Sequence, residues 1–124
     1  MAGCVTTADS LRTESLRLED RSADFYAQIR YQGEDGYRDR ISRDAQALTM
    51  SARDFNQAVA ANAPREAIAD RFSVVAASYD RLHQDLAAEG YADQNRQVLE
   101  EFDRVTAAYR DLEAAMGDRY ARAY

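Results

Sequence analysis

The sequence predicts an all-α protein, specifically an antiparallel up-down-up-down four-helix bundle. Apolar residues recur at spacings of three and four through nearly the whole chain of 124 residues, which is the period of one helix face. The five glycines and the single proline lie near the ends of four such stretches or in the N-terminal lead-in. Four stretches of similar length with short connections favour helices that run alternately up and down.

The first half of the chain contains two of these stretches. The first helix is expected from about Thr7 to Arg30, because Thr6 or Thr7 supplies an N-cap and Asp9 places a carboxylate in the first turn. The segment from Tyr31 to Tyr37, YQGEDGY, holds two glycines and two acids and is typical of a loop. A second helix follows to about Ala61.

The second half repeats this organisation. Pro64 marks the start of the third helix, since proline fits the first helical turn, where its missing N–H is not needed. Gly90 ends that helix, and a fourth is expected from about Ala92 to Gly117 or beyond. We therefore divide the chain into a tether, residues 1–6, and a single bundle domain, residues 7–124.

Residue sizes along the helices predict how the layers of the core are filled. At about 1.5 Å rise per residue, the antiparallel arrangement gives three apolar layers and two intervening layers. The apolar layers are Leu11, Phe55, Ile68 and Leu112; Leu18, Leu48, Val75 and Val105; and Phe25, Ile41, Leu82 and Val98. The intervening layers are Ser15, Ala52, Phe72 and Tyr109; and Ser22, Ala45, Tyr79 and Phe102. Each intervening layer combines two small residues with two aromatic ones, which keeps the layer volume constant, as close packing requires.

The intervening layers also place hydroxyl groups in the core. Tyr109 is level with Ser15 and Tyr79 with Ser22, so each phenol is expected to bond a serine or a backbone carbonyl. Two interpretations stay open. The polar layers either form a small ligand cavity or are satisfied core polarity that fixes the register of the helices.

Composition excludes several function classes. The net charge is −6, all sixteen basic residues are arginine and they alternate with acids, so no basic face for DNA or RNA is expected. His83 is the only histidine; Asp80 precedes it at helical spacing, but the second such pair and the inward glutamates of a di-iron bundle are missing. The core layers leave no space for haem. We expect no enzyme, no cofactor and no metal site.

The single cysteine stands in the N-terminal lead-in. Ala2-Gly3-Cys4 resembles the end of a bacterial lipobox, although Met1 replaces the usual leucine and the preceding signal regions are absent from this sequence. The resemblance implies that Cys4 becomes the lipidated N-terminus of a lipoprotein in the bacterial periplasm, on the outer membrane. An incidental thiol is the alternative. Cys4 cannot join the core, and exposed free cysteines are generally a liability.

The end of the predicted bundle opposite Cys4 is rich in tyrosines and acids. Tyr31, Tyr37 and Tyr91 gather there with Glu34 and Asp35, either as a recognition surface or as caps of the core. The leading hypothesis is a non-catalytic lipoprotein that binds a basic protein of the cell envelope, for example as an inhibitor or immunity protein. The alternative is a small-molecule sensor or carrier with its ligand at the Ser–Tyr layers.

Overall fold

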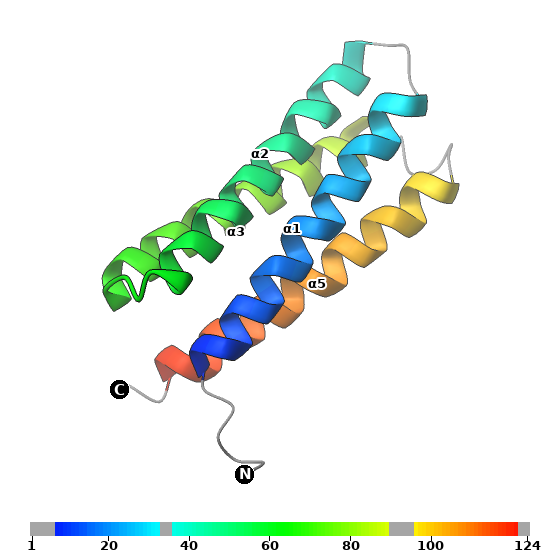
Figure 1. Cartoon of the computed structure of the whole chain (residues 1–124). Coiled ribbons are helices and arrows are strands. Elements are labelled where there is room, and N and C mark those ends of the chain that lie inside the picture. The colour runs from blue at the N-terminus through cyan, green and yellow to red at the C-terminus, as the bar shows by residue number, and fades with distance from the viewer. Residues whose placement is uncertain (1–6, 33–35, 90–95, 122–124) are drawn as a thin grey trace.

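Four α-helices account for nearly all of the described structure. The computed structural model describes residues 7–32, 36–89 and 96–121, with side chains at 11–29, 40–88 and 96–117. These residues form α1 (Thr7–Gln32), α2 (Gly36–Ala60), α3 (Arg65–Glu89) and α5 (Arg96–Ala121), and they contain no β-strand. The predicted all-α class is confirmed. In Figure 1 the start of α1, the start of α3 and the end of α5 lie at the same end of the molecule.

Two predicted helix boundaries were wrong. α1 continues to Gln32 and α2 begins at Gly36, so the backbones of Tyr31 and Tyr37 belong to helix ends and not to a loop. The physical reason is that no helix breaker precedes Gly33, and the tyrosine and glutamine before it tolerate helical geometry. The predicted start of the fourth helix near Ala92 lies outside the described residues, and α5 as described begins at Arg96.

The end of α2 is a Schellman motif that the sequence analysis did not predict. Asn62 adopts a left-handed conformation with a φ of 55°. Its N–H donates to the Val59 carbonyl at 3.1 Å, and the Ala63 N–H donates to the Ala58 carbonyl at 3.0 Å. These two bonds satisfy carbonyls at the helix end, and asparagine tolerates the left-handed region better than most residues.

The start of α3 follows at once. Pro64 precedes Arg65, the first residue of the helix, and its carbonyl accepts a hydrogen bond from the Ile68 N–H at 3.0 Å. Pro64 therefore stands one position before the helix and supplies its first acceptor. The connection between α2 and α3 is short because the capping motif of one helix leads directly into the start of the next.

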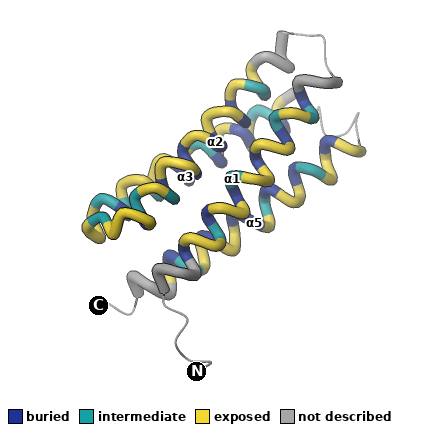
Figure 2. Tube along the Cα trace, viewed as in Figure 1, coloured by how far each residue is buried: buried dark blue, intermediate teal, exposed yellow. Residues whose placement is uncertain are grey.

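The predicted core residues are buried along the inner faces of the helices. All twelve residues assigned to the three apolar layers are at most 2% exposed. The four small residues of the intervening layers, Ser15, Ser22, Ala45 and Ala52, are fully buried. Figure 2 shows this buried stripe facing inward on each helix, with exposed residues on the outer faces.

The helix pairs differ in how closely their backbones approach. Among the described residues, α1 packs closely against α2 and α5, and α2 packs closely against α3. α3 and α5 lie farther apart. Small residues on α1 and α2 permit close contact, whereas α3 and α5 direct aromatic rings toward each other. The seam between α3 and α5 is consequently the widest.

The core makes a specific prediction about stability. Val75 is fully buried, whereas its neighbour Val74 is 54% exposed. Val75→Asp places an unpaired charge in the core and should destabilise the protein by about 4 kcal/mol or more. Val74→Asp should change the free energy of unfolding by less than about 0.5 kcal/mol. Urea unfolding followed by circular dichroism measures both, and equal effects of the two substitutions would contradict the burial pattern.

Candidate functional site

A column of parallel aromatic rings fills the seam between α3 and α5. Its members alternate between the two helices in the order Phe72, Tyr109, Tyr79, Phe102 and His83. The last ring does not extend the line, because the His83 centroid also lies 6.0 Å from that of Tyr79. Successive ring centroids are 6.1, 4.2, 5.8 and 5.9 Å apart, and the planes of successive rings differ by 5°, 6°, 8° and 16°. Such stacking contributes roughly 0.5–1.5 kcal/mol per pair beyond the burial of area. The column holds α3 and α5 together across their wide seam.

Rings from the other two helices support the column from the side. Phe25 of α1 meets Phe102 at 5.7 Å with a plane angle of 56°, and Phe55 of α2 meets Phe72 at 6.1 Å with an angle of 67°. These tilted and edge contacts are preferred geometries for aromatic pairs. The position of the column is therefore determined by all four helices.

The serines of the predicted polar layers bond mainly within their own helix. The Ser15 hydroxyl donates to the Arg12 carbonyl at 3.0 Å and lies 3.3 Å from Oδ1 of Asn56. The Ser22 hydroxyl donates to the Leu18 carbonyl at 2.7 Å. Both serines are fully buried. Their partners are protein atoms, so these hydroxyls are satisfied core polarity, and only the contact of Ser15 with Asn56 joins two helices.

The tyrosines of the same layers find partners on α5. The Tyr79 hydroxyl lies 2.8 Å from the Thr106 hydroxyl, at hydrogen-bond distance. The Tyr109 phenol donates to the Glu113 carboxylate. Burial, together with the negative charges of Glu113 and Asp80, raises the pKa of Tyr109 to about 12. Tyr109 consequently stays protonated and holds Glu113 by its hydrogen bond.

An open groove lies between α3 and α5 where the aromatic column ends. It has a volume of about 650 Å³, and Phe72, the last ring of the column, forms part of its wall. The other lining residues are Arg65, Glu66, Ala69, Ser73, Glu113, Met116 and Gly117. Most of them are exposed, so the space is a surface groove and not an enclosed cavity.

Small residues explain why this part of the seam is open. Ala69 and Gly117 line the groove from α3 and α5. A Cβ atom built on Gly117 would meet nothing within 4 Å. The next core residue of α3 beyond Phe72 is Ile68, which is buried and does not enter the groove. Among the residues with described side chains, no further aromatic ring continues the column into this space.

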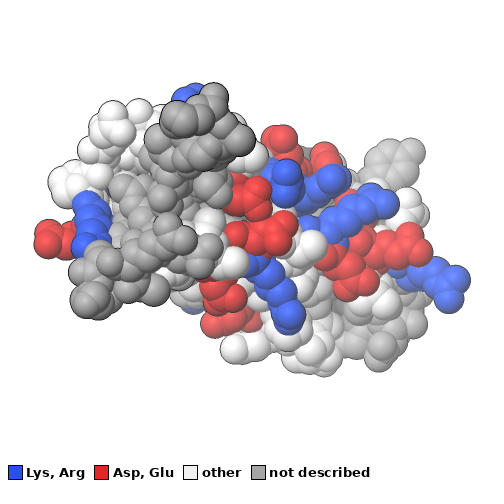
Figure 3. Space-filling model, turned by 90° about the horizontal axis from the view of Figure 1, so that it is seen from below, with Lys and Arg blue, Asp and Glu red and all other residues white. Residues whose placement is uncertain are grey.

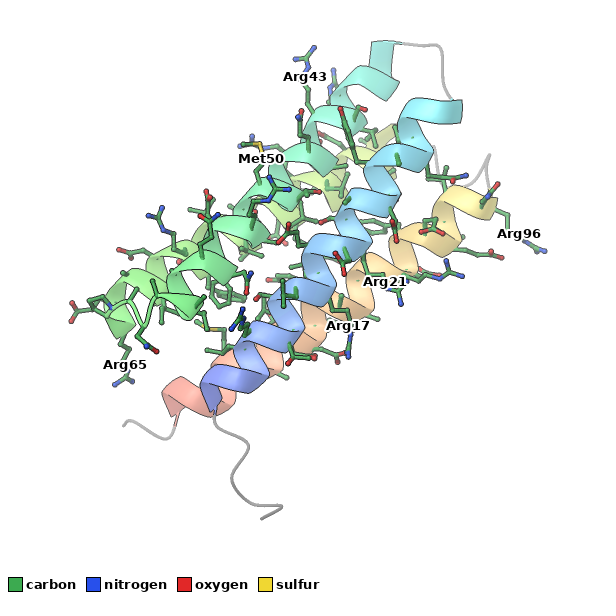
Figure 4. The ribbon with its side chains drawn as sticks, viewed as in Figure 1. Arg17, Arg21, Arg43, Met50, Arg65 and Arg96 are labelled. Carbon is green, nitrogen blue, oxygen red and sulfur yellow. The ribbon has the colours of Figure 1, made fainter. Side chains whose placement is uncertain are left out.

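The exposed face of α1 carries charged side chains that are in contact with solvent. A second hollow of about 630 Å³ lies there, lined by Thr13, Arg17, Asp20, Arg21, Ala23 and Asp24. Arg17 pairs with Glu14 at 3.2 Å and with Asp111 of α5 at 3.6 Å. Figure 4 shows Arg17 and Arg21 extending outward from α1, and Figure 3 shows acidic and basic side chains interleaved across the face in view. Exposed pairs of this kind contribute little energy.

A pair of carboxyl groups bridges α2 and α3. Asp44 is 7% exposed, and its Oδ2 atom accepts no hydrogen bond from a donor group. Asp85 faces it from α3, with Arg81 and Arg40 nearby. Burial first, and then the hydrogen bond and negative charge of Asp85, raise the pKa of Asp44 to about 7. Protonation of Asp44 removes its repulsion with the Asp85 carboxylate and allows a hydrogen bond between the two groups.

Several predicted site residues lie outside the described residues. These are Cys4, Glu34, Asp35 and Tyr91, while Tyr31 and Tyr37 are described only by their helical backbones. The lipid anchor and the tyrosine-rich tip stay predictions. Among the residues with described side chains, no three His, Cys, Asp or Glu groups converge, and no described helix combines the length and apolar content needed to cross a bilayer.

The sequence analysis missed both the carboxyl pair and the groove. Asp44 stands beside the core residue Ala45, on the edge of α2 that meets α3, and Asp85 stands on the facing edge of α3. The sequence signal that could have found the pair is the presence of two acidic residues at the facing edges of neighbouring helices. The fourth helix was expected to reach Gly117 or beyond, and α5 continues to Ala121, but no role in a groove was predicted for Gly117.

Comparisons with known proteins add nothing to this geometry: no protein-family model, curated protein or solved structure matches the chain. Its function has to be argued from the residues described above.

The carboxyl pair predicts how stability depends on pH. Because the pKa of Asp44 is about 7 in the folded protein and 3.8 ordinarily, folding takes up a proton between these values. The stability that this group contributes is complete below about pH 4 and is lost as the pH rises through 7. Asp44→Asn removes this loss and should stabilise the protein at pH 8 by on the order of 1–2 kcal/mol relative to wild type.

Urea unfolding at pH 5 and pH 8 tests this prediction. The amide group introduced by Asp44→Asn can donate to Asp85, so the substituted pair needs no shared proton. Asp54→Asn, on the exposed surface of the same helix, is the matched control and should leave the pH dependence unchanged. A pH dependence identical in wild type and Asp44→Asn would show that the pair carries no extra proton.

Proposed function

We propose that the four helices form an antiparallel up-down-up-down bundle that acts as a non-catalytic carrier or sensor of a small organic ligand. The ligand is held in the groove between α3 and α5, and not at the Ser–Tyr layers. The observation that carries the proposal is the groove itself. Its volume of about 650 Å³ falls within the range of ligand pockets, and an aromatic wall with a few polar groups is typical of such sites.

The side chains around the groove favour binding over catalysis. The Ser73 hydroxyl donates to the Ala69 carbonyl at 3.2 Å, and no histidine lines the groove to activate it as a nucleophile. Glu113 is held by the Tyr109 phenol. These groups can orient a ligand by hydrogen bonds and charge, which supports a binding role.

We further propose that Cys4 carries a lipid that holds the bundle at the outer membrane, on the periplasmic side. The start of α1 lies at the same end as the groove residues at the start of α3 and the end of α5, as Figure 1 shows. A lipidated Cys4 would therefore hold the groove near the membrane. The opposite tip would stay available to a basic envelope protein, the partner predicted from the sequence.

Blocking the groove tests the proposed function. Gly117→Leu introduces a side chain into open space, so the protein should fold while the groove is filled. In ¹⁵N-labelled wild type, millimolar 2-phenylethanol should shift the amide signals of Phe72, Ser73 and Glu113 in a saturable way. The substitution should weaken this binding at least about tenfold, because steric exclusion removes most of the contact area.

Ala107→Leu is the matched control for the groove variant. Ala107 is exposed on α5 and does not line the groove, so its replacement should leave binding unchanged. Equal affinity of wild type and Gly117→Leu, or saturable shifts confined to other surfaces, would refute the groove as the binding site.

The proposed anchor has its own test. When the chain is expressed behind a bacterial lipoprotein signal peptide, it should be found in the membrane fraction. Cys4→Ser should move it to the soluble fraction, because the variant lacks the thiol to which the lipid is attached. Mass spectrometry of the N-terminal peptide detects the acyl chains. A protein that stays unmodified with Cys4 intact would show that the lipobox resemblance is accidental.

A further inference from the structure

The groove continues the aromatic column. Phe72 stacks on Tyr109 with a plane angle of 5°, and the half-buried Phe72 ring then forms a wall of the open space. Toward the end of the helices its walls are formed by the small residues Ala69 and Gly117. A planar ring inserted here would extend the column by one member and bury the exposed part of Phe72.

The charged residues that line the groove determine which sign of charge on a ligand is favoured. Glu66 of α3 and Glu113 of α5 line it from opposite sides. Arg65 also belongs to the lining, and Figure 4 shows its side chain extending from the start of α3. Two carboxylates and one guanidinium therefore line the groove, and the excess of negative charge is complemented by a positive group on the ligand.

Tyr109 positions one of these carboxylates. Its phenol donates to Glu113, while its ring is held between Phe72 and Tyr79 in the column. The negative charges of Glu113 and Asp80 both act on the Tyr109 phenol and raise its pKa. The same stack that receives a ligand ring thus orients the carboxylate that would meet its charge.

We infer that the groove binds a small aromatic ammonium compound, with the ring stacked on Phe72 and the protonated amine between Glu66 and Glu113. This inference rests on the proposed function, because it assigns the chemical class of the ligand held in the same groove. A cation beside an aromatic face and a carboxylate gains from both contacts.

Three compounds of matched shape test the assignment: 2-phenylethylamine, 2-phenylethanol and phenylacetate. Titration of the ¹⁵N-labelled full chain at pH 7 should give an affinity for the ammonium compound at least about fivefold higher than for the alcohol. Phenylacetate should bind more weakly than the alcohol. The preference for the ammonium compound should decrease as salt is added, because the groove is open to solvent.

Two variants separate charge from shape. Glu113→Gln should reduce the preference for 2-phenylethylamine over 2-phenylethanol to near unity, whereas Glu100→Gln, exposed on the outer face of α5, should leave it intact. Tyr109→Phe keeps the ring and removes the donor, and should lower the preference while binding of the alcohol persists. That split identifies Tyr109 as a positioning residue.

The outcomes distinguish the two proposals. Saturable binding of the alcohol at the groove without preference for the ammonium compound would overturn the assigned ligand class and leave the groove function standing. No saturable binding of any of the three compounds at the groove would overturn both. A preference that survives Glu113→Gln unchanged would also overturn the assignment, because the charge that selects the ligand would then lie elsewhere.

Discussion

The architecture depends on the unequal distribution of side-chain volume among the four helices. Serines and alanines on α1 and α2 let these backbones approach closely, and aromatic rings on α3 and α5 fill the space that remains. Because the rings alternate between the two helices, a shift of α5 along α3 would unstack several pairs at once. The column therefore determines the register of the widest seam, and the groove lies where its described rings end, at Phe72.

Buried polar groups follow two different rules in this protein. The hydroxyls of Ser15, Ser22 and Tyr79 each have a hydrogen-bond partner, as buried polar atoms usually do. Asp44 instead faces a second carboxyl group, and its burial is compatible with a proton shared with Asp85. At low pH a protonated Asp44 leaves no buried charge at this point of the core. At alkaline pH two carboxylates face each other, and their repulsion destabilises the α2–α3 contact.

The sequence was sufficient to predict the helices and the core, because heptad spacing determines which residues face inward. Thus Val75 and Leu112 were placed in the core from spacing alone, and both are fully buried. It was less informative about where helices end: the left-handed conformation of Asn62 that closes α2 was not predicted, although asparagine is the residue of this connection that tolerates it best. The groove was out of reach because it depends on distances between helices, and the sequence does not show that Gly117 borders open space.

The stacked pair at the centre of the column gives the protein an optical property. The chain contains eight tyrosines and no tryptophan, so its near-ultraviolet absorption is dominated by phenol rings. The ring centroids of Tyr79 and Tyr109 lie 4.2 Å apart and the ring planes are nearly parallel, so the rings are close enough for their electronic transitions to couple. One of these rings belongs to α3 and the other to α5, and Tyr109 also stacks on the ring that borders the groove. The molecule therefore contains its own spectroscopic reporter of the separation between the two helices.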